Sequence, residues 1–153
     1  MPPRTPQRVP EHTHDEVNER IQEAIRRSVA HYARCDREGI DRRLAELDQE
    51  WDIERALEFN AATLATSSIA LGLSGRKRWF LLAGTVTAFL AQHALQGWCP
   101  PLPILRRLGF RTAREIDQER YALKALRGDF ADLSIDEEAD PEARVNAALE
   151  AAG

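Results

Sequence analysis

The sequence predicts an all-α protein built around a two-helix transmembrane hairpin, with amphipathic cytoplasmic helices on either side of it. Charged residues make up 30% of the 153-residue chain, yet no Asp, Glu, Lys or Arg occurs in residues 59–75 or in residues 79–105. Outside these two stretches, apolar residues recur at the spacing of one helix face. No stretch alternates convincingly with the period of two that a half-buried strand shows, so we expect no sheet.

Composition excludes several classes of function. A net charge of -4 argues against a nucleic-acid-binding protein, which would carry a basic domain. The two cysteines, Cys35 and Cys99, are too few for a disulfide framework or for a four-cysteine zinc site. No catalytic constellation stands out. We therefore expect no enzyme, no cofactor, no metal and no nucleic-acid partner.

Residues 1–14 are predicted to form a disordered arm, because four prolines fall within the first ten residues. No apolar segment typical of a cleavable signal peptide is present there. Residues 15–56 then form charged amphipathic helices. The first runs over residues 15–37, and the second starts near residue 41 and places Ile40, Leu44, Leu47 and Trp51 on one face. These apolar stripes are narrow, so the helices are expected to pack on each other, on a partner or at a membrane surface.

Residues 57–105 are predicted to form the transmembrane hairpin. The first uncharged segment spans 17 residues, about 25 Å as a helix, and it contains several hydroxyl side chains that oppose insertion. The second is more apolar, and its two tryptophans, Trp79 and Trp98, lie about 28 Å apart along a helix. This separation matches two membrane interfaces, so both indoles are candidate interface anchors.

Small residues recur four positions apart in both segments of the hairpin. Ser68 and Gly72 form such a pair in the first segment, and Gly84 and Ala88 form one in the second. This spacing lets two helix backbones approach closely in lipid, so the four residues are predicted to pack the hairpin.

After the hairpin, residues 106–128 are predicted to contain a cytoplasmic helix, which begins at the capping box formed by Thr112 and Glu115. Residues 129–153 are predicted to form an acidic tail with a short helix, since seven acidic residues and no basic one lie within residues 129–142. The prediction of a short helix rests on Asp140 and Pro141, which are typical of a helix start.

The distribution of basic residues predicts the orientation. The arginines near the hairpin on the side of the termini are Arg42, Arg43, Arg55, Arg106, Arg107, Arg111 and Arg114. Three basic residues, Arg76, Lys77 and Arg78, lie in the turn between the two segments. This excess places both termini in the cytoplasm. The expected partners are the lipid bilayer and either a second copy or another protein bound through the N-terminal helices.

Residues 53–130, about half of the chain, resemble the YgaP-like inner-membrane transmembrane domain family of bacteria. The resemblance is carried by Asp52-Ile53-Glu54-Arg55, the two apolar segments, Gly97-Trp98-Cys99-Pro100 and Leu108-Gly109. The Cys-Pro step is its most specific element. The resemblance implies two membrane helices, a bacterial inner-membrane location and a domain of unknown function.

In some members of that family the domain follows a rhodanese module, which transfers sulfur. This chain has a helical extension in that place. Cys35 stands between Arg34 and Asp36, without the Gly-rich anion-binding loop that a sulfur-transferring cysteine needs. Sulfurtransferase activity is therefore not implied for this chain.

Cys99 and His93 are the candidate functional residues. A Cys-Pro step can ligate haem, and a thiol near a membrane interface can take part in redox exchange. The alternative is that Cys99 has only the structural role of ending a helix. The partial negative charge at a helix C-terminus disfavours the thiolate form of a cysteine there. His93 is a possible second ligand or a hydrogen-bonded structural group.

The favoured function is a membrane-anchored scaffold or assembly partner. The alternatives are a redox or sulfur-handling protein that uses Cys99, and a soluble all-α oligomer.

Overall fold

Seven helices make up the regular structure of residues 7–130, the part of the chain that the computed structural model describes. This part contains no strand, so the prediction of an all-α fold is confirmed. The helices are α1 (Arg8–Glu11), α2 (Asp15–Tyr32), α3 (Arg37–Gln49), α4 (Ile53–Leu73), α5 (Trp79–Gln96), α6 (Leu102–Arg107) and α7 (Ala113–Arg127).

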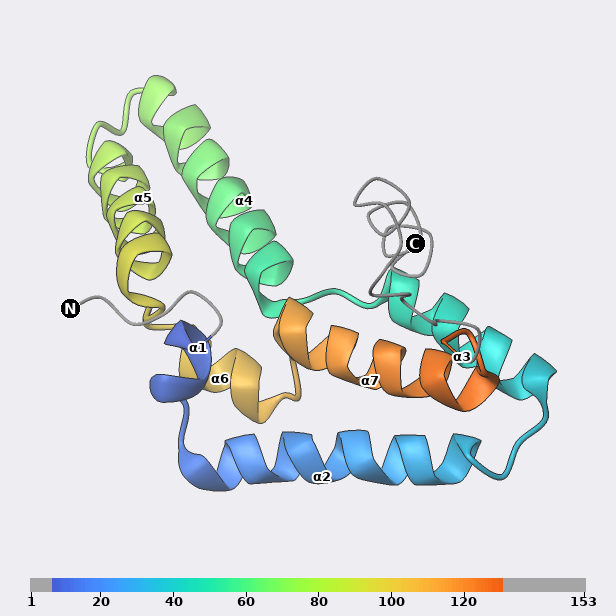
Figure 1. Ribbon diagram of the computed structural model, residues 1–153. Helices are drawn as coiled ribbons and strands as arrows, with labels where there is room; N and C mark the ends of the chain where they lie inside the picture. The colour runs from blue at the N-terminus through green and yellow to red at the C-terminus, as the bar shows by residue number, and fades with distance from the viewer. Residues whose placement is uncertain (1–6, 131–153) are drawn as a thin grey trace, which may run out of the picture.

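Two parts of the fold differ in shape. Helices α4 and α5, with the turn at residues 74–78, form an antiparallel hairpin that projects from the rest of the molecule (Figure 1). Helices α1, α2, α3, α6 and α7 form what we call the base. Within the base, α7 packs against both α2 and α3. The hairpin therefore extends from a layer of helices in which α7 is central.

The base has an apolar core on both sides of α7. Val17, Ile21 and Ile25 are buried along α2, which packs on α7. On the other side, α3 and α7 share one cluster, which consists of Ile40, Leu44, Leu47, Ile116 and Leu123. The narrow stripes of the two N-terminal helices are thus covered within the chain itself.

The ends of the helices are set by local side-chain chemistry. Asp52 caps α4 by accepting a hydrogen bond of 2.7 Å from the backbone N–H of Arg55. Thr112 and Glu115 form the capping box at the start of α7. Gly97 ends α5 in the left-handed conformation, with φ of 77°, which a residue with a side chain adopts only with strain.

The prediction of disorder for residues 1–14 is wrong for the described residues 7–14. Residues Arg8–Glu11 form α1, and Val9 is 1% exposed in a cluster with Ile53, Leu57, Cys99 and Leu102. Pro10 lies within the first turn of this short helix, where a missing N–H costs little. Burial of Val9 offsets the ordering of the segment. Residues 1–6 lie outside the described residues.

Three other boundaries differ from the predicted ones. Helix α3 begins at Arg37, because Asp36 caps it through the N–H of Gly39, and it ends before Trp51. Trp51 is exposed rather than on the buried face. The short helix α6 follows Pro100 and Pro101, where only a departure from helical geometry was expected. Most of the acidic tail, residues 131–153, lies outside the described residues.

Candidate functional site

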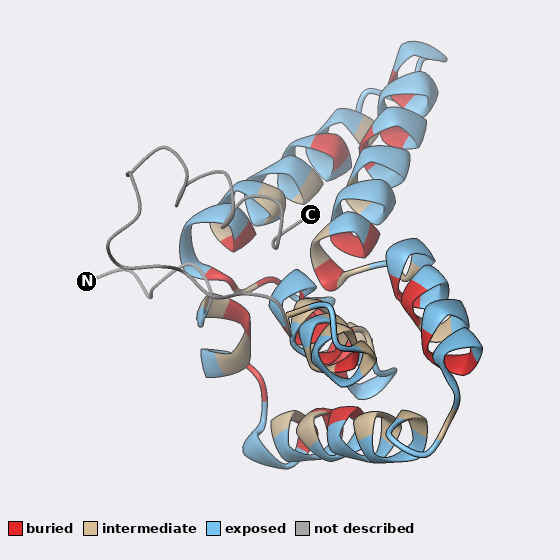
Figure 2. Cartoon of the chain, turned by 45° about the vertical axis from the view of Figure 1, so that its right-hand side comes forward, coloured by how far each residue is buried: buried red, intermediate tan, exposed pale blue. Residues whose placement is uncertain are grey.

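The hairpin is the most unusual surface of the molecule. Most of its residues are exposed (Figure 2). Large apolar side chains on α4 and α5 are exposed along the length of the hairpin: Phe59, Leu64, Ile69, Leu71, Leu73, Phe80, Leu81, Leu82, Phe89 and Leu95. Contiguous apolar surface of this kind marks a site of contact with a membrane or another protein.

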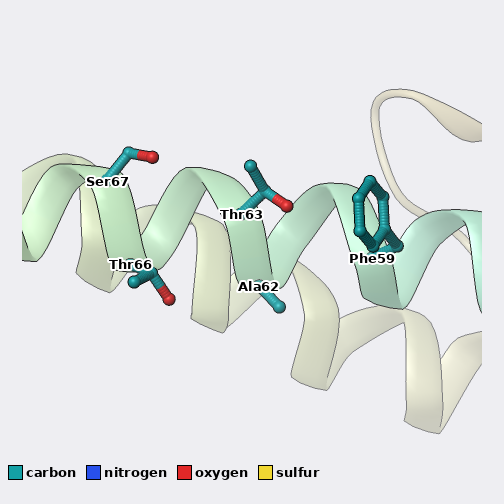
Figure 3. Close-up of a pocket in the computed structure, with 5 residues that line it drawn as sticks. All are labelled: Phe59, Ala62, Thr63, Thr66 and Ser67. Carbon is teal, nitrogen blue, oxygen red and sulfur yellow. The ribbon is translucent and has the colours of Figure 1, made fainter.

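One outer face of α4 carries small and hydroxyl side chains. Figure 3 shows five residues, Phe59, Ala62, Thr63, Thr66 and Ser67, which line a shallow groove along this helix. All five are exposed. This face is uncharged but less apolar than the rest of the hairpin.

The residues predicted to pack the hairpin are divided between its inside and its outside. Ser68 and Gly72 are buried on α4, and a Cβ atom at Gly72 would lie 2.8 Å from the ring of Phe80 on α5. Gly84 and Ala88 are exposed on α5, and nothing lies within 4 Å of a Cβ atom at Gly84. Ala83, one position before Gly84, is buried, as is His93 near the end of α5. The expected pair of small residues in α5 therefore does not face α4.

Cys99 lies at the junction of the hairpin and the base. Its side chain is buried in the cluster that also contains Val9 and Leu102. It lines one end of an apolar cavity of about 450 Å³ between α4, α5 and the start of α6. The cysteine is a free thiol. Chemically it is a buried thiol in apolar surroundings, which is the setting of a structural cysteine.

His93 is also buried, one turn before the end of α5. Neither of its ring nitrogens has a hydrogen-bond partner within residues 7–130. Arg8 lies close by, because its Nη1 atom donates to the carbonyl of Ala94 at 3.0 Å. No hydrogen bond in the described part of the chain joins His93 to Cys99, so the two candidate residues do not form a common site.

Arg8 ties the N-terminal segment to the foot of the hairpin. Its backbone packs directly against Gly97, where a Cβ atom would lie 2.6 Å from the Arg8 carbonyl carbon. Its guanidinium lies 4.0 Å from Glu54 on the first turn of α4. Burial raises the pKa of Glu54 above its ordinary value. Arg8 thus contacts both helices of the hairpin where they leave the base.

The tryptophans do not occupy equivalent positions. Trp79 is half-buried at the start of α5, and Trp98 is half-buried because it packs against the cluster around Cys99. Trp51 is exposed, and its ring contacts Phe59 edge to face and lies 4.5 Å from the guanidinium carbon of Arg55. Indole rings are enriched at membrane interfaces, and Trp51 was not among the predicted interface anchors.

Arg106 is the central polar residue of the base, and its side chain is fully buried. Its Nη atoms donate to both carboxylate oxygens of Glu115, at 2.7 and 2.9 Å. Its remaining hydrogen bonds go to Thr13, Asn18 and the Phe110 carbonyl. All five of its N–H donors are therefore used, and they join α6 to α7 and to the segment around the start of α2.

A second ion-pair network is centred on Glu119, one helical turn after Glu115 on the same face of α7. Glu119 is buried and accepts hydrogen bonds from Arg43 at 2.9 Å, from Ser28 and from Arg111. Arg111 also binds Glu50 through two hydrogen bonds. The backbone carbonyl of Arg111 accepts from the N–H of Ile53 at 2.8 Å, at the start of α4. This network therefore fixes α3 and the foot of the hairpin to α7.

The electrostatics of the two buried glutamates are alike. Burial alone would raise the pKa of Glu115, but hydrogen bonds from Arg106 and from the Thr112 backbone outweigh it, and the pKa lies below its ordinary value. Burial would likewise raise the pKa of Glu119, and the bonds from Arg43, Ser28 and Arg111 lower it further than burial raises it. Both groups are held as carboxylates.

The tip of the hairpin has a different charge character. Arg76, Lys77 and Arg78 are all exposed there, and none of them forms an ion pair with a residue of the described part of the chain. No acidic residue occurs between Glu58, in the second turn of α4, and Glu115, so beyond Glu58 the formal charges of the hairpin are the three cations of its tip.

No helix within residues 7–130 reaches the combination of length and apolar character that crossing a membrane demands. In the same residues, no three His, Cys, Asp or Glu side chains are grouped as ligands of a metal ion would be. Comparison of the chain with protein-family models, with curated proteins and with solved structures finds no match in any of the three.

Proposed function

We propose that this chain is a small bacterial inner-membrane protein whose α4–α5 hairpin is embedded in the bilayer and whose base is a cytoplasmic scaffold. The observation that supports it most is the contrast between hairpin and base. The hairpin exposes ten large apolar side chains, whereas the base buries most of its large apolar residues; the exposed ones in the base are Ile104, Leu108, Tyr121 and Leu126. Lipid is the environment that would cover the hairpin from all sides.

The uncharged part of the hairpin fits a locally thinned bilayer. Helix α5 has 18 residues, about 27 Å, and residues 59–73 of α4 extend about 22 Å, against a hydrocarbon thickness of about 30 Å. A short hydrophobic segment is accommodated by thinning of the bilayer and by snorkelling of the flanking cations. The proposal concerns the two helices as a pair, which insert together and bury Ser68 and Gly72 between them.

The proposed orientation puts both termini and the base in the cytoplasm. The excess of arginines near the hairpin on the side of the base supports it. Trp51 and Arg55, at the foot of α4, would then lie at the cytoplasmic interface. The tip with its three cations would lie at the opposite surface.

The role of scaffold or assembly partner rests on the rigidity of the base. Two buried ion-pair networks hold α2, α3 and α7 in one arrangement, so their outer faces present a fixed pattern of charges to a partner or a second copy. Because the apolar stripes of α2 and α3 are buried, such contact would use charged outer residues such as Arg26, Arg27 and Glu23.

Fractionation of bacterial membranes tests the proposed location. The full chain should sediment with membranes after an alkaline wash. The double variant Leu64→Asp, Phe89→Asp should be released, because each carboxylate at an exposed mid-hairpin position opposes insertion by about 2.5–3.5 kcal/mol.

The matched control for this experiment is Ala24→Asp, Ala45→Asp. These substitutions add the same charges to exposed positions of α2 and α3 and should leave the chain in the pellet. Release of the unmodified chain by the wash would argue for a soluble oligomer instead. Equal retention of the mid-hairpin variant would show that insertion of the hairpin is not what holds the chain in the membrane.

A further inference from the structure

The tip of the hairpin concentrates positive charge without an internal counter-charge. Arg76, Lys77 and Arg78 are consecutive and exposed, in a turn that Gly75 allows through its φ of 101°. Carboxylates are missing from residues 59–114 altogether. Any anion that neutralises these cations must therefore come from outside the hairpin.

The cations lie directly next to exposed apolar side chains. Leu73, the last residue of α4, is 76% exposed, and Leu81, in the first turn of α5, is 75% exposed. Phe80 is exposed between them in sequence and packs over Gly72. The tip thus combines three cationic groups with the exposed side chains of Leu73, Phe80 and Leu81, which we call the apolar collar.

We propose that the tip binds the headgroups of anionic phospholipids at the membrane surface it reaches. This inference rests on the proposed function, because the hairpin must lie in the bilayer for the tip to meet headgroups. The two arginine guanidinium groups match the geometry of phosphate oxygens, and adjacent basic residues are attracted to anionic lipid surfaces.

The apolar collar decides between a lipid and other anions. A free phosphate ion or an acidic peptide segment would neutralise Arg76, Lys77 and Arg78 but would leave Leu73 and Leu81 in water. A phospholipid carries the anion and the acyl chains in one molecule, so it satisfies both features at once. The long stems of the three cations also reach from apolar surroundings to a headgroup.

Quenching of tryptophan fluorescence by brominated lipids tests the proposal, because Trp79 is adjacent to Arg78. The full chain is reconstituted in vesicles of phosphatidylcholine and phosphatidylglycerol at equal mole fractions. Bromine is placed on the acyl chains of one lipid or of the other. The contribution of Trp79 is the difference between the full chain and its Trp79→Phe variant.

At low salt, brominated phosphatidylglycerol should quench Trp79 about twofold more than brominated phosphatidylcholine, and high salt should reduce the difference. The variant Arg76→Gln, Lys77→Gln, Arg78→Gln should lose the preference. The control Arg26→Gln, Arg27→Gln, Arg34→Gln removes equal charge from exposed positions of α2 and of the turn that follows it, and it should keep the preference.

The outcomes separate this inference from the proposed function. Equal quenching by the two lipids, or a preference that persists in the tip variant, would overturn lipid binding by the tip and leave insertion intact. Absence of quenching by either lipid would overturn both, because Trp79 would then not be in the bilayer.

Discussion

Arg106 and Glu115 form a bidentate ion pair, with N–O distances of 2.7 and 2.9 Å, although the arginine side chain is fully buried. Desolvation of two charges is costly, and it is tolerated only where the remaining donors and acceptors are satisfied. Thr13, Asn18 and the Phe110 carbonyl accept the other hydrogen bonds of Arg106. The pair therefore specifies how α6, α7 and the start of α2 meet.

The substitution Arg106→Met should destabilise the base strongly, because it leaves Glu115 buried without its partner. The expected loss in the free energy of unfolding is about 3–5 kcal/mol. Arg107→Met is the matched control, since Arg107 is the exposed neighbour and should change stability little. Thermal unfolding followed by circular dichroism in mild detergent measures both, and equal melting temperatures would contradict the assigned role of Arg106.

Stability of the base should fall in acid. The pKa values of Glu115 and Glu119 lie below the ordinary value of 4.5, because their arginine hydrogen bonds outweigh burial. A carboxylate whose pKa is lowered by folding contributes stability that is complete above its unfolded-state pKa. That stability is lost as the pH falls through the lower, folded-state value.

We therefore expect the melting temperature to fall steadily below pH 4.5. The variant Glu115→Gln should be less stable at neutral pH and should show a shallower dependence on acid, because one titrating group is removed. Glu16→Gln, at an exposed position of α2, is the control and should retain the slope of the unmodified chain. An unchanged slope in Glu115→Gln would refute the linkage.

Gly97→Ala should loosen the N-terminal segment from the foot of the hairpin. The added methyl group would lie 2.6 Å from the backbone of Arg8, and the φ of 77° disfavours any side chain. Trypsin should then cleave after Arg8 several-fold faster than in the unmodified chain. Gly84→Ala is the control, because Gly84 has open space around it within α5 and alanine favours the helix. Equal cleavage rates in both variants would show that Arg8 is not held by Gly97.

The two cysteines should differ in reactivity. Cys99 is buried in the cluster with Val9 and Leu102, whereas Cys35 is partly exposed after the end of α2. In the folded chain, a water-soluble maleimide should therefore label Cys35 within minutes and Cys99 only after unfolding. Mass spectrometry of the labelled peptides distinguishes the sites. Labelling of Cys99 as fast as that of Cys35 would favour the redox alternative over a structural role.

The features of this structure that the sequence predicted are those that depend on residues close together in the chain. The capping box at Thr112, the turn at residues 74–78 and the uncharged helices follow from neighbouring residues, and all were expected from the sequence. The burial of Arg106 was not, because Arg107 beside it has the same chemistry, and only the path of α6 decides which one faces Glu115.

The N-terminal segment and α5 show the same limit. Prolines around Val9 indicate disorder, and only the tertiary contact of Val9 with Ile53 and Leu102 reverses that prediction. The small-residue spacing in α5 predicted that Gly84 and Ala88 pack against α4, but both are exposed and Ala83 is buried instead. The exposed position of Trp51 also depends on where α3 ends, at Gln49, which its sequence pattern does not reveal.

The central claim, that the hairpin lies in lipid, is tested most directly by a spin label at Leu64→Cys in a Cys35→Ser background. The label replaces a side chain that is 52% exposed midway along α4. In reconstituted vesicles, collisions with apolar oxygen should dominate over collisions with a water-soluble nickel complex. The same label at Ala24→Cys, exposed on α2, should show the reverse. Dominance of the nickel complex at position 64 would show that the hairpin lies in water and would contradict the membrane-anchored account.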